Sequence, residues 1–260
     1  MNRAEVPALA AYGLEKKYGQ VRALRGASFE AFAGQVTALV GDNGAGKSTL
    51  IKCLAGVIQP DFGQIMVDGR PVSMSDPVHA TKHGIETVYQ DLALASDLDA
   101  AANVFLGREI RRMRVLHDHK EMRRRTAASF SDLGVGLVQD MRVPVSSFSG
   151  GQRQSVAIAR AAMWAKHVII MDEPTAALGV IQTEKVLQLI QKVRSRGLAV
   201  VLISHNLPQV IDVADRIEVM RLGARVARFR RGEVDVERLI AAVSGAFSNE
   251  ADVPNGEVTA

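Results

Sequence analysis

The chain has 260 residues, of which 47% are hydrophobic, so it has enough apolar material for a sizeable core. Its formal net charge of +4 is a mild excess, and aromatic residues are only 5%, which argues against an aromatic-rich basic surface for single-stranded nucleic acid. Cys53 is the only cysteine, so an internal disulfide is excluded, and we expect its thiol to be buried. No stretch approaches the roughly 18 consecutive apolar residues that a membrane-spanning helix requires.

The first 40 residues are predicted to contain short strands separated by turns. Residues 1–19 hold no apolar run of signal-peptide length before charged residues return. Residues 35–40, QVTALV, have the continuous apolar character of a buried strand.

A glycine-rich segment, VGDNGAGKSTL, follows this strand at residues 40–50. Residues 41–48 fit the pattern G-x-x-x-x-G-K-[ST], in which bare backbone N–H groups surround phosphates. Lys47 would reach the β- and γ-phosphates, and Ser48 would ligate Mg²⁺. After the loop, apolar residues recur at helical spacing, which predicts a helix. The N-terminus of that helix would favour an anion. The apolar residues are Leu50, Cys53, Leu54, Val57 and Ile58. A chance glycine-rich turn is the alternative, but the flanking strand and helix favour a nucleoside triphosphate site.

The middle of the chain is predicted to be a hairpin followed by helices. Residues 60–72 have a Pro-Asp start and an Asp-Gly turn at 68–69, which is typical of a hairpin. Residues 91–166 are expected to be rich in helix and carry a basic run at 111–125. We expect this run to be a solvated helix face; contact with lipid headgroups or an acidic partner is the alternative.

The C-terminal part alternates strand, helix and strand, which is the pattern of an α/β sheet. Residues 167–173, HVIIMDE, read as a central strand that delivers Asp172 and Glu173 to the carboxyl edge of the sheet. Asp172 would bind Mg²⁺ through water and Glu173 would polarise an attacking water, unless the two acids are merely a surface pair. An amphipathic helix at 186–197, a strand at 198–205 and a hairpin at 216–229 complete the pattern.

A second anion-binding device lies at residues 147–161, SFSGGQRQSVAIARA. Ser149 is placed to cap a helix whose first residues, Gly150 and Gly151, leave the backbone bare. One nucleotide does not require two such devices, so the second is expected to serve a nucleotide bound by a partner.

With these motifs in this order, roughly residues 8–240 resemble the ATP-binding subunits of ABC transporters. The resemblance implies roles for matching residues. Tyr18 would stack on adenine, unless it is a core tyrosine, and Gln90 would contact Mg²⁺ or the attacking water and relay the nucleotide state to a permease. His205 would contact the γ-phosphate, although a lone histidine is often structural. The expected phosphate-binding set is Gly41, Asp42, Asn43, Gly44, Ala45, Gly46, Lys47, Ser48 and Thr49; Ser149, Gly150, Gly151 and Gln152 would close over the ATP of a second subunit.

Three positions depart from the pattern of that family. Gly179 stands where an aspartate that helps to couple the two ATP sites is usual, which puts that coupling in doubt. Phe148 replaces a leucine, a conservative apolar change, and Asn206 stands where aspartate is common.

The resemblance implies an α/β P-loop fold of RecA type, with a mostly parallel sheet, an antiparallel β portion and a helical subdomain. The expected core comprises residues 1–89 and 167–243, and the expected helical subdomain comprises residues 90–166. A polar tail at 244–260 is expected to be poorly ordered. The groove beside the helical subdomain would receive a permease helix, with Leu92, Leu94 and Phe105 as candidate contacts or as ordinary packing residues.

Residues 84–109, 171–180 and 201–223 are similar to the ATPases of bacterial monosaccharide importers, with single-domain fructose-importer ATPases as the nearest likeness. This implies ATP and Mg²⁺ as ligands and hydrolysis at a head-to-tail homodimer. The implied partners are an integral-membrane permease and, indirectly, a periplasmic sugar-binding protein, with no nucleic acid. The implied location is peripheral, on the cytoplasmic face of the cell membrane.

Three other functions use related motifs. ATPases that act on nucleic acids carry long coiled coils or two ATPase halves, and neither is found in this sequence. An exporter ATPase would have the same chemistry and a different permease. A non-hydrolysing regulatory subunit is disfavoured because Lys47, Asp172, Glu173 and His205 are all intact.

Overall fold

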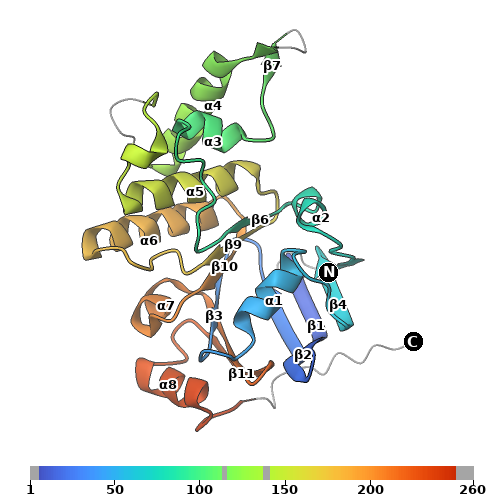
Figure 1. Ribbon diagram of the computed structural model, residues 1–260. Coiled ribbons are helices and arrows are strands. Elements are labelled where there is room, and N and C mark those ends of the chain that lie inside the picture. The colour runs from blue at the N-terminus through green and yellow to red at the C-terminus, as the bar shows by residue number, and fades with distance from the viewer. Residues whose placement is uncertain (1–5, 113–115, 137–140, 250–260) are drawn as a thin grey trace.

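A six-stranded sheet forms the centre of the molecule (Figure 1). The computed structural model describes residues 6–112, 116–136 and 141–249. Five strands of this sheet are parallel, and the edge strand β12 is antiparallel to its neighbour. The spatial order is β12 (Ala224–Arg230), β11 (Arg216–Arg221), β3 (Val36–Val40), β10 (Ala199–Ile203), β9 (Val168–Asp172) and β6 (Ile85–Val88).

The central strands are apolar along their whole length because both faces of the sheet are covered. Every residue of β3 and β10 is buried. Alternate side chains enter different clusters: Ile169 and Met171 face one side, whereas Val168 and Ile170 face the other. The continuous apolar runs of the sequence are therefore explained by burial on both faces, and the predicted α/β class is confirmed.

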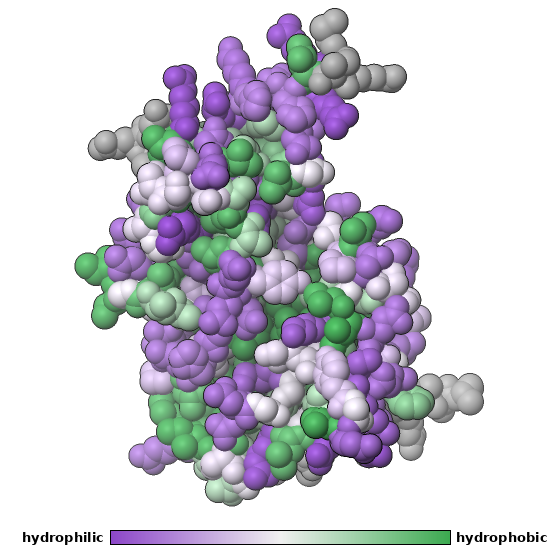
Figure 2. Space-filling model, viewed as in Figure 1, coloured by the Kyte–Doolittle hydropathy of each residue, from purple (hydrophilic) through white to green (hydrophobic). Residues whose placement is uncertain are grey.

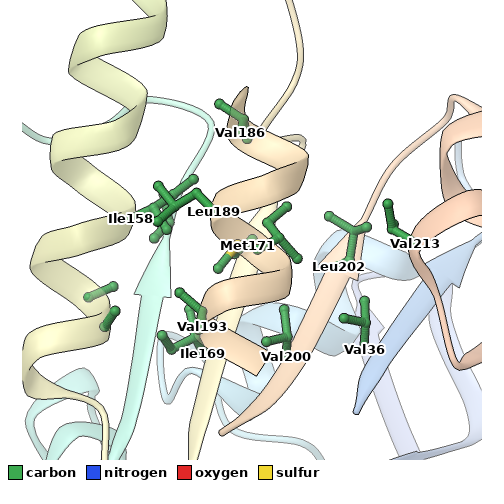
Figure 3. Packing of buried hydrophobic residues seen from close by; sticks show 14 of the residues in the cluster. Val36, Ile158, Ile169, Met171, Val186, Leu189, Val193, Val200, Leu202 and Val213 are labelled. Carbon is green, nitrogen blue, oxygen red and sulfur yellow. The ribbon is translucent and has the colours of Figure 1, made fainter. Parts of the chain in front are cut away.

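Helices α5 to α8 cover one face of the sheet, and Figure 3 shows side chains of α5, α6 and α7 near the strands. Val186, Leu189 and Val193 recur on α6 at helical spacing and pack over Met171 and Val200. This spacing explains why one side of α6 is apolar. The helices are α5 (Gly150–Trp164), α6 (Val180–Ser195), α7 (Leu207–Val213) and α8 (Val236–Ser244).

An antiparallel sheet and helix α1 cover the opposite face. In this antiparallel sheet, the turn between β4 and β5 lies at Asp68-Gly69, and both residues have positive φ, as the sequence pattern predicts. Helix α1 ends at Leu54, and Gly56 adopts a positive φ of 72°, so the expected continuation through Val57 and Ile58 is wrong. The elements are β2 (Val21–Ala31), β1 (Leu9–Tyr18), β4 (Phe62–Val67), β5 (Arg70–Val72), α1 (Lys47–Leu54) and α2 (Pro77–Lys82).

A helical part lies beyond α5 and carries hydrophilic side chains at the end far from the sheet (Figures 1 and 2). The basic run at 111–125 is not one helix: Arg111–Arg112 and Leu116–His117 pair as short antiparallel strands, and the helix begins at His119. Phe105 is buried and packs edge-on against Trp164, so it is not an exposed contact residue. The elements are α3 (Ala100–Phe105), β7 (Arg111–Arg112), β8 (Leu116–His117), α4 (His119–Leu133) and a 3₁₀ turn (Val145–Ser147).

The last described residues lie against the edge strand β12. Phe247 stacks on Phe229 with ring centroids 5.9 Å apart. The side chain of Asn249 forms two hydrogen bonds with the backbone of Arg228. Residues 250–260, which belong to the expected polar tail, lie outside the described residues. Within the described chain, no helix combines the length and apolar character that crossing a membrane requires.

Candidate nucleotide-binding and hydrolysis site

The loop between β3 and α1 follows a path that requires glycine at two positions. Gly41 has a φ of 152°, and a Cβ there would lie 2.2 Å from the carbonyl oxygen of Met220. Gly46 has a φ of 99°, and a Cβ would lie 2.7 Å from the carbonyl oxygen of Ala23. Helix α1 begins immediately afterwards at Lys47, so its free N–H groups face the loop. The loop can therefore surround an anion with backbone donors.

Lys47 folds back over this loop. Its Nζ donates hydrogen bonds to the carbonyl oxygens of Gly41 and Asp42, at 2.6 and 3.0 Å. Burial lowers the pKa of Lys47, while the carboxylates of Glu173 and Asp42 oppose that shift. Backbone carbonyls thus hold the ammonium at the loop that would receive phosphate.

The parallel register brings the two predicted acids to the same edge as the loop. Asp172 pairs with Ile203 of β10, and Ile203 in turn pairs with Leu39 of β3, close to where the loop begins. Burial raises the pKa of Asp172, and the neighbouring Glu173 raises it further, while Lys47 lowers it. Lys52 also lowers this pKa, and because the net shift is still upward, the two adjacent carboxylates favour an additional cation at this position.

Glu173 is fixed by its backbone and by its neighbour His205. Its φ of 51° lies in the left-handed region, and its N–H donates to the carbonyl oxygen of Ile203 at 3.0 Å. Its Oε2 lies 2.9 Å from Nδ1 of His205. The Glu173 side chain is 16% exposed and the His205 side chain is 76% exposed. The structure therefore brings a shielded carboxylate and an accessible imidazole together, as a water-activating pair requires.

Gln90 and Tyr18 lie around this edge. Gln90 is exposed and comes two residues after Val88, which pairs with Met171 of β9. Tyr18 is 47% exposed at the end of β1. It pairs with Val21 at the start of β2, and Ala23 of the same strand contacts Gly46. Tyr18 is therefore an exposed ring beside the phosphate loop and not a core tyrosine.

Residues 149–152 form a rigid helix start. Ser149 Oγ accepts from the Gln152 N–H at 3.3 Å, and Gln152 Oε1 accepts from the Ser149 N–H at 2.8 Å, which completes a capping box. A hollow of about 390 Å³ lies beside them, and α4, α5 and α6 contribute most of its lining. No residue of the loop 41–49 lines it, so these motifs are separate surfaces of one chain.

Asn206 and Phe148 have local structural explanations, whereas nothing in the structure requires glycine at position 179. Gly179 precedes α6 in extended conformation and provides no side-chain cap. Asn206 caps α7, because its Oδ1 accepts from the Gln209 N–H at 3.2 Å. Phe148 is buried in the main core cluster.

The sequence did not predict that residues at the β11–β12 turn contact the phosphate loop and hold it in place. The N–H of Gly223 donates to the carbonyl oxygen of Ala45 at 2.9 Å, and Met220 contacts Gly41. These contacts join segments about 180 residues apart in the chain, and no local sequence pattern signals them.

The donor set fits Mg²⁺ that is shared with a nucleotide. Among the described residues, no three side chains of the His, Cys, Asp and Glu types gather as a complete metal cage. Mg²⁺ in nucleotide sites keeps waters and takes few protein ligands, the rest being phosphate oxygens. The Ser48 hydroxyl, Asp172 carboxylate and Gln90 amide supply suitable oxygen donors.

Comparison with known proteins identifies the type of site. A family model described as "ABC transporter" matches residues 24–176. The fructose import ATP-binding protein FrcA of Rhizobium meliloti is 47% identical over 249 residues, which cover 94% of this chain and 96% of that protein. The xylose/arabinose import ATP-binding protein XylG of Sulfolobus acidocaldarius is 42% identical, over 87% of this chain and 89% of that protein.

Solved structures agree with this match. A cassette of an ABC transporter superposes with a TM-score of 0.80 at 23% identity, covering 94% of this chain and 99% of that one. A dimeric cassette in a post-hydrolysis state, bound to ADP and Pi, gives a TM-score of 0.72 at 26% identity, covering 87% of this chain and all of that one. The first shows the fold, and the second shows that a similar cassette forms a dimer with nucleotide.

Proposed function

The chain belongs to the ABC transporter family of ATP-binding cassettes, and from this membership we propose that it drives monosaccharide import through a separate membrane permease. The observation that carries the proposal is the 47% identity to a fructose import ATP-binding protein along 94% of this chain, and the contact between Glu173 and His205 supports it. We propose a sugar of the fructose, ribose or xylose type.

The site supports ATP binding by the loop and by Tyr18. Backbone N–H groups of residues 41–49 would hold the phosphates, while the Lys47 ammonium would exchange its carbonyl partners for β- and γ-phosphate oxygens. Tyr18 would stack on adenine, since it is an exposed ring next to the loop.

Mg²⁺ would be held by Ser48 and Gln90 and, through water, by Asp172. When bound, it would neutralise phosphate charge in the transition state. The raised pKa of Asp172 is consistent with this role, because a cation relieves the repulsion between Asp172 and Glu173.

Hydrolysis would use Glu173 as the base. A water oxygen would attack the γ-phosphorus while the Glu173 carboxylate takes its proton, and the bond to the β–γ bridging oxygen would break to leave ADP and phosphate. His205, held at 2.9 Å from Glu173, would orient that carboxylate and donate to the γ-phosphate.

A second copy would complete each site. Ser149, Gly150, Gly151 and Gln152 are rigid and lie apart from the loop of their own chain, which supports their use on the ATP of a partner. Two copies would close on two ATP molecules head to tail and open when the γ-phosphate leaves. ATP would thereby favour one of two states, which is the requirement for a switch.

The transport partners follow from the proposed import function. The dimer would dock on a permease at the cytoplasmic face of the cell membrane, through the groove beside the helical part. Leu92 and Leu94 are half-buried, pack against the main core cluster and are the candidate contacts. A periplasmic sugar-binding protein would deliver the cargo, which would not contact this chain.

Uptake of labelled sugars tests the proposal. Cells that lack the gene would be restored with wild type or with Glu173→Gln, and offered fructose, ribose, xylose, mannose and galactose separately. We expect uptake of one sugar to be lost and to return only with wild type. Equal uptake of all five sugars with and without the gene would contradict the sugar-import proposal.

A further inference from the structure

Three arginines line a hollow at the edge of the six-stranded sheet. The hollow has a volume of about 310 Å³ and is lined by Arg216 of β11, by Arg228, Phe229 and Arg230 of β12, and by Glu233. Arg216 and Arg230 are direct partners in the register of the β11–β12 hairpin. The sheet itself therefore brings the guanidinium-bearing residues together.

Arg216 is held in place without a carboxylate partner. Its guanidinium lies 3.9 Å from the ring centroid of Phe32, and its Nε donates to Gln35 Oε1 at 2.9 Å. In the described part of the chain, no carboxylate lies within ion-pair distance of it. Burial lowers the pKa of Arg216, and the charges of Arg230 and Arg228 lower it further, while the carboxylates of Glu30 and Glu218 oppose that shift.

The two neighbouring arginines differ in their partners. Arg228 Nη1 forms an ion pair with Glu30 Oε2 at 2.6 Å. Arg230 forms no ion pair with any described carboxylate, while Glu233 accepts a hydrogen bond from the backbone N–H of Arg230 at 2.7 Å. Among the described residues, Arg216 and Arg230 thus form no ion pair, and the three guanidiniums outnumber the one carboxylate that lines the hollow, that of Glu233, which favours an anionic ligand.

We propose that this hollow binds a small phosphate monoester through Arg216, Arg228 and Arg230. Guanidinium forks match phosphate oxygens in bidentate geometry, and an anchored arginine loses little conformational entropy on binding. The volume lies at the lower end of the range for small-molecule sites, which suits a phosphorylated compound of a few carbons and not a nucleotide polyphosphate.

The hollow is separate from the ATP site. Arg216 pairs with Thr37 at the beginning of β3, whereas the phosphate loop begins at Gly41 after the strand ends. The two positions are four residues apart along the chain, or about 13 Å along the strand. The site is independent of the proposed sugar import and of nucleotide occupancy.

Calorimetric titration with glycerol 3-phosphate tests the proposal, with neutral glycerol as the matched ligand. The full chain would carry Lys47→Ala, so that the nucleotide loop does not supply the phosphate site. We expect glycerol 3-phosphate to bind one to one and glycerol not to bind. Adding Arg216→Gln or Arg230→Gln should weaken binding about tenfold or more, because each removes a charge-assisted hydrogen bond. Arg230 is exposed, so its variant keeps the test valid if loss of Arg216 disturbs folding.

Arg231→Gln is the control for charge alone, since Arg231 is exposed beside the hollow and does not line it. It should change the affinity less than twofold. The proposal is overturned if Lys47→Ala abolishes binding, if Arg230→Gln binds as tightly as the Lys47→Ala chain, or if Arg231→Gln weakens binding as much as Arg230→Gln.

Discussion

At the scale of single residues, the contact between Glu173 and His205 is the feature that most directly favours hydrolysis. A left-handed backbone at a glutamate costs free energy, and here it places the carboxylate 2.9 Å from the imidazole. Glu173 is predicted from its place after a buried strand, whereas the role of His205 comes from the resemblance to ABC transporter ATPases. Their contact depends on strands β9 and β10 lying side by side, which no local pattern encodes.

Replacing the proposed base tests its role. Glu173→Gln should keep ATP binding but lower turnover by about 10²- to 10⁴-fold, the usual contribution of a general base. The variant should accumulate as a closed dimer in gel filtration with Mg-ATP. Glu173→Gln combined with Lys47→Ala is the control and should remain monomeric. Normal turnover by Glu173→Gln would remove Glu173 from the base role.

Glu218 is a buried carboxylate that makes stability depend on pH. It lies 3.1 Å from Arg225, accepts from the Glu30 N–H, and is near Arg228. Burial raises its pKa from 4.5 to about 7, so the folded chain binds more protons than the unfolded chain between these values. Its contribution to stability is therefore complete below pH 4.5, falls as pH rises to about 7, and is constant above that.

Urea unfolding of wild type and Glu218→Gln at several pH values checks this expectation. The wild type should lose stability relative to the variant as pH rises from about 5 to about 7, by at most about 1.4 kcal/mol per pH unit. Glu237→Gln, at an exposed position, controls for loss of one carboxylate. A difference between wild type and Glu218→Gln that stays flat across this range would contradict the assignment.

At the scale of elements, the phosphate loop is shaped by distant strands as much as by its own glycines. The carbonyl oxygen of Met220 in β11 lies against Gly41, and that of Ala23 in β2 lies against Gly46, so neither position has room for a Cβ. The loop, β3 and the start of α1 were predicted from local pattern. The end of α1 was not, because Val57 continues the apolar spacing but is 44% exposed after the turn at Gly56.

Two glycines of this loop should respond differently to alanine. Gly41→Ala should cost about 1–3 kcal/mol more unfolding free energy than Gly44→Ala and weaken ATP binding, since its Cβ would overlap the Met220 carbonyl. Gly44 has a φ of 83°, but a Cβ there would meet no atom within 4 Å, so Gly44→Ala should cost about 1 kcal/mol. Urea unfolding and nucleotide titration measure both, and equal losses would contradict the role of β11.

Helix α6 begins without a side-chain cap at Gly179. Aspartate fits the extended backbone there, since a Cβ would contact only the flexible end of Gln182 at 2.9 Å. Gly179→Asp should therefore raise the free energy of unfolding by a few tenths of a kcal/mol and keep ATP turnover, with equal or steeper ATP dependence. Thermal unfolding and an ATP titration of turnover measure these effects. Complete loss of turnover would mean that bare backbone is required at Gly179.

At the scale of the whole molecule, the two anion-binding motifs lie on separate surfaces of one chain. The order of strands and helices predicted the α/β class, because buried parallel strands and amphipathic helices have distinct periodicities. The strand pair within the basic run was missed, since Arg111–Arg112 and Leu116–His117 are too short to show a period. The separation of Ser149 from Lys47 follows from packing between α4, α5 and α6, which local patterns do not specify.

Mixing two inactive variants tests most directly whether two copies share each ATP site. Lys47→Ala disables the loop, and Ser149→Arg disables the helix start. In a dimer of one copy of each variant, one site joins the defective loop to the defective helix start. The other site joins the intact loop of the Ser149→Arg copy to the intact helix start of the Lys47→Ala copy. Equimolar mixing should therefore restore about a quarter of wild-type ATP turnover, if the two sites of the symmetric dimer act independently. Turnover that stays at the level of the separate variants would contradict a site shared between two copies.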